Sequence, residues 1–270
     1  MTQTILLTGA TDGIGLETAK RLAAAGHTLL LHGRSEEKLA AAAVTVSRVP
    51  GVGTVKTFRA DLSDLGQVVT LSEAVSAETQ HLDVLINNAG VFKMSNPTTT
   101  DGFDARFIVN TIAPYLLIRK LLTLMGEGGR VVNLSSAAQA PVSLEALRGR
   151  QKLGDGEAYA QSKLAITMWS FELAKELSEG GPSVMAVNPA SFLGSKMVKE
   201  AYGHAGHDLG IGADILVRMS TSPDFAGVSG KYFDNDQRRL ADPHPDALNS
   251  TKNKNLITVM EQIIASRLAV

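Results

Sequence analysis

Tyr159 and Lys163 lie four positions apart in a segment with helical spacing, so both side chains are expected on one helix face. A phenol has an ordinary pKa of about 10 and is a poor base at neutral pH. A nearby ammonium stabilises the phenolate and lowers that pKa towards the working range. Many helices carry this pair by chance, so a further group must support it. Ser135 and Ser136 end the apolar run Arg130–Leu134 and offer hydroxyls that could hold a substrate carbonyl beside the phenol.

A glycine-rich turn stands near the start of the chain, where Thr8–Gly15 reads TGATDGIG. Gly9 permits a tight turn, Gly13 allows close approach to a diphosphate, and Gly15 allows the next helix to pack near the strand. The helix N-terminus then favours an anion. Such glycines also occur in plain turns, but this position between a strand and a helix favours a dinucleotide site. A P-loop is disfavoured, because no Gly-Lys-Ser/Thr closes the motif.

The end of the second apolar run bears on which dinucleotide is bound. NAD sites usually place an acid there, where it binds the ribose 2′-hydroxyl. In this chain Gly33 and Arg34 follow the run instead. Because no carboxylate stands at this position, a 2′-phosphate would not be repelled. The guanidinium of Arg34 can pair with that phosphate, which favours NADP(H) over NAD(H). A solvated arginine at a helix start is the alternative.

Two more polar groups stand out against apolar surroundings. Asn87–Gly90 closes the fourth apolar run, where amides can fix neighbouring loop backbone and border a cofactor. Asn110 lies in an otherwise apolar helical stretch, and a polar amide there needs partners. It is therefore either a helix-kink residue or a member of a proton relay.

The elements that position these residues alternate along the chain. Strands are predicted over Thr4–Thr8, His27–His32, Thr54–Ala60, Asp83–Asn87, Arg130–Leu134, Val184–Asn188 and Lys231–Asp234. Helices are predicted over Leu16–Ala25, Glu36–Val46, Leu65–Thr79, Phe103–Met125, Tyr159–Leu177 and Asn255–Leu268. Continuously apolar strands spaced by helices indicate a parallel sheet covered on both faces. We expect an α/β, single-domain, Rossmann-type doubly wound sheet of about seven strands over residues 1–270. The loops at 137–157 and 190–212 leave strands at the edge where ligands bind, so they are the expected substrate walls.

Composition excludes several classes of protein. The chain has 270 residues, no cysteine and a formal net charge of -1. Disulfides and thiol nucleophiles are therefore excluded, and no strong field would attract nucleic acid. The N-terminus has no basic signal region, and no apolar run is expected to reach the ~20 residues of a membrane span. A soluble, cytoplasmic protein is expected.

Other catalytic sites find little support. His204 and His207 are three apart, but no acid follows at a ligand spacing, so no metal site is expected. The chain has no Gly-x-Ser-x-Gly elbow, which argues against a serine hydrolase.

The motifs, taken in order, resemble the short-chain dehydrogenase/reductase family from Thr4 to about Asp234. The resemblance rests on the Thr8–Gly15 turn, Asp61-Leu62, Asn87–Gly90, Asn110, Ser136 and the Tyr159/Lys163 pair. It implies a catalytic tetrad of Asn110, Ser136, Tyr159 and Lys163. The cofactor-binding residues that it implies, together with Arg34, are Gly9, Thr11, Asp12, Gly13, Ile14, Gly15, Arg34, Asp61, Leu62, Asn88, Ala89, Gly90, Tyr159, Lys163, Pro189 and Ser195.

The resemblance also implies a mechanism, in which hydride moves between nicotinamide C4 and a carbonyl or alcohol carbon. Tyr159 would donate or accept the proton on oxygen, and Ser136 would hydrogen-bond that oxygen. Lys163 would lower the pKa of the phenol and hold the nicotinamide ribose, while Asn110 would position a water. The cofactor carries the chemistry, and the protein supplies orientation and proton transfer.

Three features depart from the usual family pattern. The 23-residue step from Ser136 to Tyr159 is long and looks like the retinol-dehydrogenase-like branch, which implies a lipophilic carbonyl substrate. Pro189-Ala190 replaces the usual Pro-Gly, and Ser195 stands for the usual threonine if one residue is inserted.

The resemblance further implies a homodimer or homotetramer formed by the helices after strands four and five. A nucleotide-sensing regulator without turnover is the main alternative function, and an intact Tyr159/Lys163 pair with Ser136 counts against it. A sugar epimerase or dehydratase would need a longer substrate domain.

Overall fold

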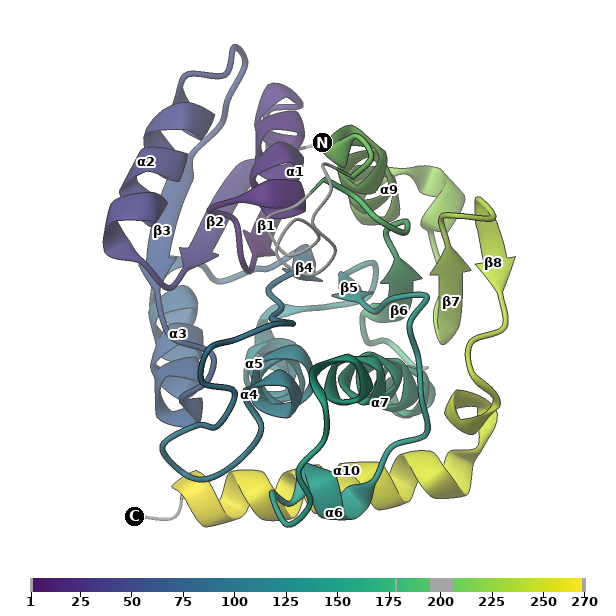
Figure 1. Ribbon diagram of the computed structural model, residues 1–270. Helices are drawn as coiled ribbons and strands as arrows, with labels where there is room; N and C mark the ends of the chain where they lie inside the picture. The colour runs from purple at the N-terminus through teal and green to yellow at the C-terminus, as the bar shows by residue number, and fades with distance from the viewer. Residues whose placement is uncertain (1, 178, 195–205, 269–270) are drawn as a thin grey trace.

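The chain folds around one twisted sheet, seen in the computed structural model of residues 2–177, 179–194 and 206–268 (Figure 1). Its strands are β1 (Thr4–Leu7), β2 (Thr28–Gly33), β3 (Val55–Arg59), β4 (Val84–Asn87), β5 (Arg130–Leu134), β6 (Ser183–Asn188), β7 (Lys231–Asp234) and β8 (Arg239–Ala241). Their order is β3-β2-β1-β4-β5-β6-β7-β8. The order reverses between β1 and β4, so a crevice is expected at the carboxyl ends of these two strands. The predicted Rossmann-type α/β fold is confirmed.

The eighth strand was not predicted. β1 to β7 are parallel, whereas β8 runs antiparallel to β7 at the edge of the sheet. The turn between them is too short for a crossover, so the chain can only return as a hairpin. Arg239-Leu240-Ala241 also carries too few apolar residues to be recognised as a buried strand.

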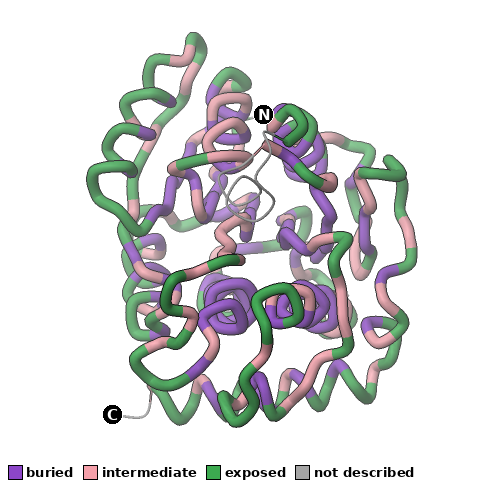
Figure 2. The backbone as a smooth tube through the Cα atoms, in the orientation of Figure 1, coloured by how far each residue is buried: buried purple, intermediate pink, exposed green. Residues whose placement is uncertain are grey.

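Helices cover both faces of the sheet. They are α1 (Gly13–Ala24), α2 (Glu36–Ser47), α3 (Leu65–Glu78), α4 (Ala105–Phe107), α5 (Ala113–Leu121), α6 (Leu144–Leu147), α7 (Asp155–Glu176), α9 (Leu209–Thr221) and α10 (Ser250–Leu268). One core lies under α1, α2 and α9, and the other under α3, α5, α7 and α10. Leu6 and Leu7 of β1 belong to different cores, because successive side chains of a strand point to opposite faces. Figure 2 shows the buried residues concentrated on the strands and on α5 and α7.

The predicted helix over Phe103–Met125 is not continuous. The short α4 is followed by a π-helical turn, Ile108–Ile112, and then by α5 and a 3₁₀ turn, Leu122–Leu124. The π turn centres on Asn110, and Pro114 stands in the first turn of α5. Single π turns inside helices are frequently found at functional sites.

This broken helix also corrects the expectation about membrane spans. Ala105–Leu124 is long and apolar enough to cross a membrane by length and composition, and 67% of the window is buried inside the protein. A helix that is buried on most sides must be apolar around most of its circumference. The apolar composition of Ala105–Leu124 is therefore accounted for by its place between the sheet and α3, α7 and α10.

The loop boundaries differ from those expected. α7 begins at Asp155 and not near Tyr159, and the 137–157 loop contains α6. α9 begins at Leu209, inside the 190–212 loop, of which residues 195–205 lie outside the described residues. α10 begins at Ser250, before the expected Asn255. The start of α6 is set by the cap at Ser143, whose hydroxyl accepts from the Ala146 N–H, and hydrophobic periodicity does not report such a contact.

Candidate active site

A cavity of about 330 Å³ opens at the carboxyl ends of β1 and β4, where the strand order reverses. The predicted cofactor residues that line it are Gly9, Thr11, Asp12, Gly13, Ile14, Gly15, Arg34, Asp61, Leu62, Asn88, Ala89, Gly90, Tyr159, Lys163 and Pro189. Ser195 lies outside the described residues, as does His204. The cavity is also lined by residues to which no role was given: His32, Ala60, Val91, Val109 and Leu134. Of these, Val91 directly follows the Asn87–Gly90 motif, which could have indicated it.

The glycine-rich turn has no room for a side chain at Gly9 or Gly15. Gly9 and Gly13 have φ of +67° and +54°, values that favour glycine. A Cβ atom at Gly15 would overlap the carbonyl oxygen of Gly9, and one at Gly9 would lie 2.8 Å from the Cα of Ala89. The Asp12 side chain accepts a hydrogen bond from the Gly13 N–H at 2.7 Å and caps α1. The turn therefore leaves an open backbone cradle at a helix N-terminus, a setting that suits a diphosphate.

The end of β4 braces this cradle. The Asn88 Nδ2 donates to the carbonyl oxygens of Thr8 and Gly9, at 2.9 and 3.0 Å. The backbone N–H groups of Asn88 and Ala89 both donate to the Thr8 hydroxyl oxygen at 3.1 Å. The amide thus fixes the loop backbone on the neighbouring strand.

His32 braces the cradle from β2. Its Nε2–H donates to the carbonyl oxygen of Ala60 at 3.1 Å, and its Nδ1 accepts from the Gly9 N–H at 3.3 Å. The carbonyl must accept, so these two bonds define the tautomer of a neutral ring. Burial lowers the pKa of His32 to about 4. No pattern in the sequence distinguishes this residue from other strand-end histidines.

The rim of the cavity carries Arg34, whose side chain is mostly exposed. Its guanidinium lies 4.0 Å from the carboxylate of Asp61. A Cβ atom at Gly33 would overlap the Cγ2 atom of Thr11. Position 33 therefore cannot take the acidic side chain that would bind a ribose 2′-hydroxyl unless Thr11 moves.

Tyr159 and Lys163 both reach the cavity from α7. The Lys163 Nζ lies 5.7 Å from the centre of the Tyr159 ring and donates to the carbonyl oxygen of Leu134 at 2.8 Å. Burial lowers the pKa of Lys163 to about 8. The ring of Phe92 lies against Tyr159, with centroids 4.6 Å apart. The phenol thus has an ammonium and an aromatic ring as neighbours.

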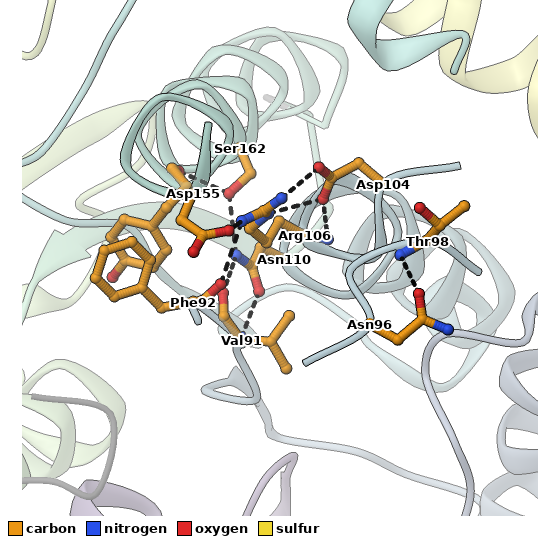
Figure 3. Close-up of polar contacts among 10 residues, drawn as sticks. Val91, Phe92, Asn96, Thr98, Asp104, Arg106, Asn110, Asp155 and Ser162 are labelled. Carbon is orange, nitrogen blue, oxygen red and sulfur yellow. Dashed lines mark hydrogen bonds and ion pairs between the residues drawn. The ribbon is translucent and has the colours of Figure 1, made fainter. Parts of the chain in front are cut away.

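Asn110 braces the segment that follows β4 (Figure 3). Its Oδ1 accepts from the Val91 N–H at 2.8 Å, and its Nδ2 donates to the Val91 carbonyl at 2.9 Å and to the Ser162 hydroxyl at 3.0 Å. The amide therefore finds its partners in the backbone of the cavity wall and in α7, at the π turn. Asn110 thus lies at a helix irregularity, as the first of its two alternatives predicted, and a part in a proton relay stays a prediction.

Ser136 lies beside the cavity and is not among the described residues that line it. Its neighbour Ser135 is one of the lining residues. The Ser136 hydroxyl oxygen accepts from the Ala138 N–H at 3.1 Å, and its carbonyl accepts from the Tyr232 hydroxyl at 3.0 Å. The Ser135 hydroxyl donates to the Lys163 carbonyl at 2.8 Å, which ties β5 to α7. The two serines thus differ in their contacts: Ser135 joins β5 to α7, while Ser136 contacts the loop that follows β5.

The described ranges contain no group of three His, Asp or Glu side chains that could hold a metal ion. The backbone N–H of His207 donates to the backbone carbonyl oxygen of Phe192 at 2.7 Å.

Comparisons with known proteins agree with this geometry. Residues 3–205 match the family model described as short chain dehydrogenase. Retinol dehydrogenase 13 of Mus musculus is 30% identical over 286 residues, which covers 99% of this chain and 85% of that protein. The structure of an uncharacterized protein from Mycobacterium paratuberculosis has a TM-score of 0.79 at 26% identity, over 97% of this chain and 93% of that one. The angucycline C-6 ketoreductase LanV with bound NADP has a TM-score of 0.68 at 25% identity, over 86% and 93% of the two chains.

Proposed function

Because the chain belongs to the short-chain dehydrogenase/reductase family, we propose that it is an NADP(H)-dependent enzyme that reduces a lipophilic carbonyl or oxidises the matching alcohol. Family membership makes it an NAD(P)-dependent oxidoreductase; the choice of NADP(H), the substrate class and the residue roles are the proposal. One observation carries it: the glycine cradle, Arg34 and the Tyr159/Lys163 pair line a single cavity.

The cradle fits a dinucleotide. Its glycines allow backbone N–H groups to approach a diphosphate, and α1 adds the positive end of its dipole. Nicotinamide, when bound, supplies or accepts the hydride. Lys163 and Tyr159 line the same cavity and would hold the nicotinamide end beside the substrate.

Tyr159 is the proposed proton donor in reduction and proton acceptor in oxidation. With a pKa of about 8, Lys163 is mostly an ammonium at neutral pH, and its charge favours the phenolate. Ser136 would hydrogen-bond the substrate oxygen, and Asn110 would hold the cavity wall at Val91 and position a water. These groups orient the substrate and move one proton, which is the protein's share of the reaction.

Two features of the rim support NADP(H). Arg34 can pair with a 2′-phosphate by charge-assisted hydrogen bonds, and Gly33 leaves no carboxylate to repel it. The NADP bound to the ketoreductase LanV points the same way.

A lipophilic substrate is supported by the walls and by the relatives. Val91 and Val109 line the cavity, and two exposed apolar side chains lie outside this lining, Phe192 three residues after Pro189 and Ile211 in α9. Asn235 ties these segments together, since its Nδ2 donates to the carbonyl oxygens of Pro189 and Ile211. The relatives include a retinol dehydrogenase and an angucycline C-6 ketoreductase.

A paired calorimetric titration with NADP⁺ and NAD⁺ tests the cofactor, with Arg34→Ala alongside. We expect NADP⁺ to bind roughly 10- to 100-fold more tightly, and Arg34→Ala to lose most of that preference, as for the loss of a charge-assisted hydrogen bond. Arg48→Ala, an exposed arginine at the other end of α2, is the matched control and should change nothing. Equal affinity for both dinucleotides would show that the Arg34 argument is wrong.

Turnover is then measured with NADPH on retinal and on aromatic polyketide ketones. Tyr159→Phe should lower kcat by about 100-fold or more, because the proton donor is lost. Tight NADP⁺ binding without turnover of any carbonyl would favour the nucleotide-sensing alternative.

A further inference from the structure

Arg106 is a charged side chain in the protein interior, with only 1% of its surface exposed. Its Nε–H and Nη2–H donate to the two carboxylate oxygens of Asp104, at 2.8 and 2.6 Å. Its Nη1 donates to Asp155 at 2.5 Å and to the carbonyl oxygen of Phe92 at 3.5 Å. Figure 3 shows these groups gathered around the guanidinium, beside Asn110.

The partners of this guanidinium belong to three segments around the cavity. Asp104 caps α4, Asp155 is the first residue of α7, and Phe92 follows the β4 motif by two residues. Two of them, Asp155 and Phe92, are close to Tyr159 in sequence or in space. Asp155 lies one helical turn before Tyr159, and the Phe92 ring lies 4.6 Å from the Tyr159 ring at an interplanar angle of 45°.

The chemistry of arginine explains why a cation occupies this position. A buried ion pair adds little to stability compared with an apolar side chain, because both charges must leave water. A guanidinium, however, presents five N–H donors in a rigid plane and can hold several acceptors at fixed angles. Arg106 and Asn110 lie one turn apart and hold the carbonyl oxygens of two consecutive residues, Phe92 and Val91, of which Val91 lines the cavity.

We propose that Arg106 is a positioning residue for proton transfer, which fixes the Tyr159 ring through Phe92 on one side and through Asp155 at the start of α7. The proposal rests on the proposed function, in which Tyr159 moves the proton. Arg106 does not itself touch substrate or cofactor, and it acts by limiting the orientations of the phenol.

The test measures NADPH-dependent carbonyl reduction by Arg106→Gln, Asp155→Asn and Phe92→Ala. We expect kcat to fall roughly 10- to 100-fold, because a misplaced reacting group costs this much. The KM for NADPH should change by no more than about twofold, since ground-state binding is untouched. The primary deuterium isotope effect on kcat should rise as the chemical step slows.

Arg119→Gln is the matched control. Arg119 of α5 pairs with Glu176 of α7, so it is also an arginine paired with an acidic residue of α7, but it lies at a distance from the cavity. It should leave kcat and the isotope effect unchanged.

A double-variant cycle tests the route through Phe92. If Arg106 acts through that ring, Arg106→Gln should lower kcat much less in the Phe92→Ala background than in the wild type. If the double variant instead shows the product of the two single-variant losses in kcat, the role of Phe92 is overturned. A wild-type kcat and isotope effect in Arg106→Gln, with only a lower melting temperature, would overturn the proposal as a whole.

Asp155→Asn keeps the test decisive if Arg106→Gln does not fold. The Asp155 side chain is about half exposed, and Arg106 keeps its pair with the Asp104 carboxylate when Asp155 is replaced, so the substitution leaves no unpaired charge in the interior. The same loss of kcat and the same rise in isotope effect are expected, and their absence would contradict the proposal.

A spectrophotometric titration separates this proposal from the proposed function. The absorbance of phenolate is recorded against pH, and the Tyr159→Phe curve is subtracted to isolate Tyr159. Burial raises the pKa of Tyr115 and Tyr232, so their ionisation lies further from neutral pH. If the wild type turns over no carbonyl, the proposed function is wrong. The positioning role is still supported if the midpoint of the Tyr159 titration shifts in Arg106→Gln and not in Arg119→Gln. An unchanged midpoint in Arg106→Gln would overturn the positioning role.

Discussion

Ala190 shows how one substitution in a family pattern is accommodated. Its φ of +124° lies in a region that favours glycine, and the family pattern places glycine here. The next residue holds the conformation, because the Ser191 N–H and hydroxyl both donate to Asp236, at 2.9 and 2.6 Å. Asn188 donates to the same carboxylate at 2.9 Å. The strain at Ala190 is thus carried by a polar network at the ends of β6 and β7.

Ala190→Gly should stabilise the protein by about 1 kcal/mol, because relief of the strain exceeds the entropy cost of glycine. Urea unfolding measures the change. Ala40→Gly, on the exposed side of α2, is the control and should destabilise by about 1 kcal/mol. A loss of stability in Ala190→Gly similar to that of the control would contradict the argument.

His32 makes stability depend on pH. Its folded-state pKa of about 4 lies below the ordinary value of 6.5, so the folded protein keeps the ring neutral while the unfolded chain takes up a proton. Stability from this residue is therefore fully present above pH 6.5 and falls as the pH drops towards 4. We expect a free energy of unfolding about 2 kcal/mol lower at pH 5 than at pH 7 from this group.

His32→Asn isolates this contribution, because asparagine does not titrate. Urea unfolding gives the free energy of unfolding of both proteins at pH 5 and at pH 7. The change between the two pH values should be smaller in the variant than in the wild type. The comparison is needed because burial also lowers the pKa of His27, which contributes in the same direction. Equal pH dependence in both proteins would show that His32 is not responsible.

At the scale of elements, α10 closes the lower core (Figure 1). Its buried side chains, Asn253, Leu256, Val259, Met260 and Ile263, recur at helical spacing and pack against α7 and α3. Polar contacts join it to the same layer: the Tyr115 hydroxyl of α5 donates to Glu261 at 2.9 Å, and the Ser250 hydroxyl donates to Glu172 of α7 at 3.0 Å. α10 is therefore part of the core that supports α7 and Tyr159.

Met260→Asp should destabilise the protein by about 3–5 kcal/mol, because it places an unpaired charge in this core. Thr258→Asp, on the exposed side of the same helix, adds the same charge and should cost less than about 0.5 kcal/mol. Thermal unfolding measures both. Similar melting temperatures for the two variants would mean that α10 is not a stabilising part of the core.

For the whole molecule, the position of α10 bears on self-association. The homodimer or homotetramer inferred from the family resemblance would use α5 and α7, the helices after β4 and β5. α10 packs along α7 and reaches α5, and Trp169 of α7 is fully buried within the chain, edge-on to Tyr115. A homo-oligomer therefore stays a prediction. Its interface would have to lie on a surface other than the one that α10 covers. The cytoplasmic location also stays a prediction.

Much of the architecture was predictable from local patterns. Apolar runs and helical spacing predict β1 to β7 and most of the helices, because burial on both faces requires continuous apolar strands. The chemistry of the glycine turn and of the Tyr159/Lys163 pair is likewise encoded in residue type and spacing. Each of these features involves residues that are close to one another in the sequence, so the sequence alone is enough to predict it.

Other features depend on contacts between distant segments, which no local pattern reports. His32 meets Gly9 and Ala60, Arg106 meets Asp155, and α10 meets α7 only after the chain has folded. The π turn at Asn110 forms because the amide finds Val91 and Ser162 there, and β8 forms because β7 offers a free edge. Hydrogen bonds of buried polar groups are satisfied across the fold and not along the chain. For this reason the tertiary structure alone decides how the phenol of Tyr159 is held.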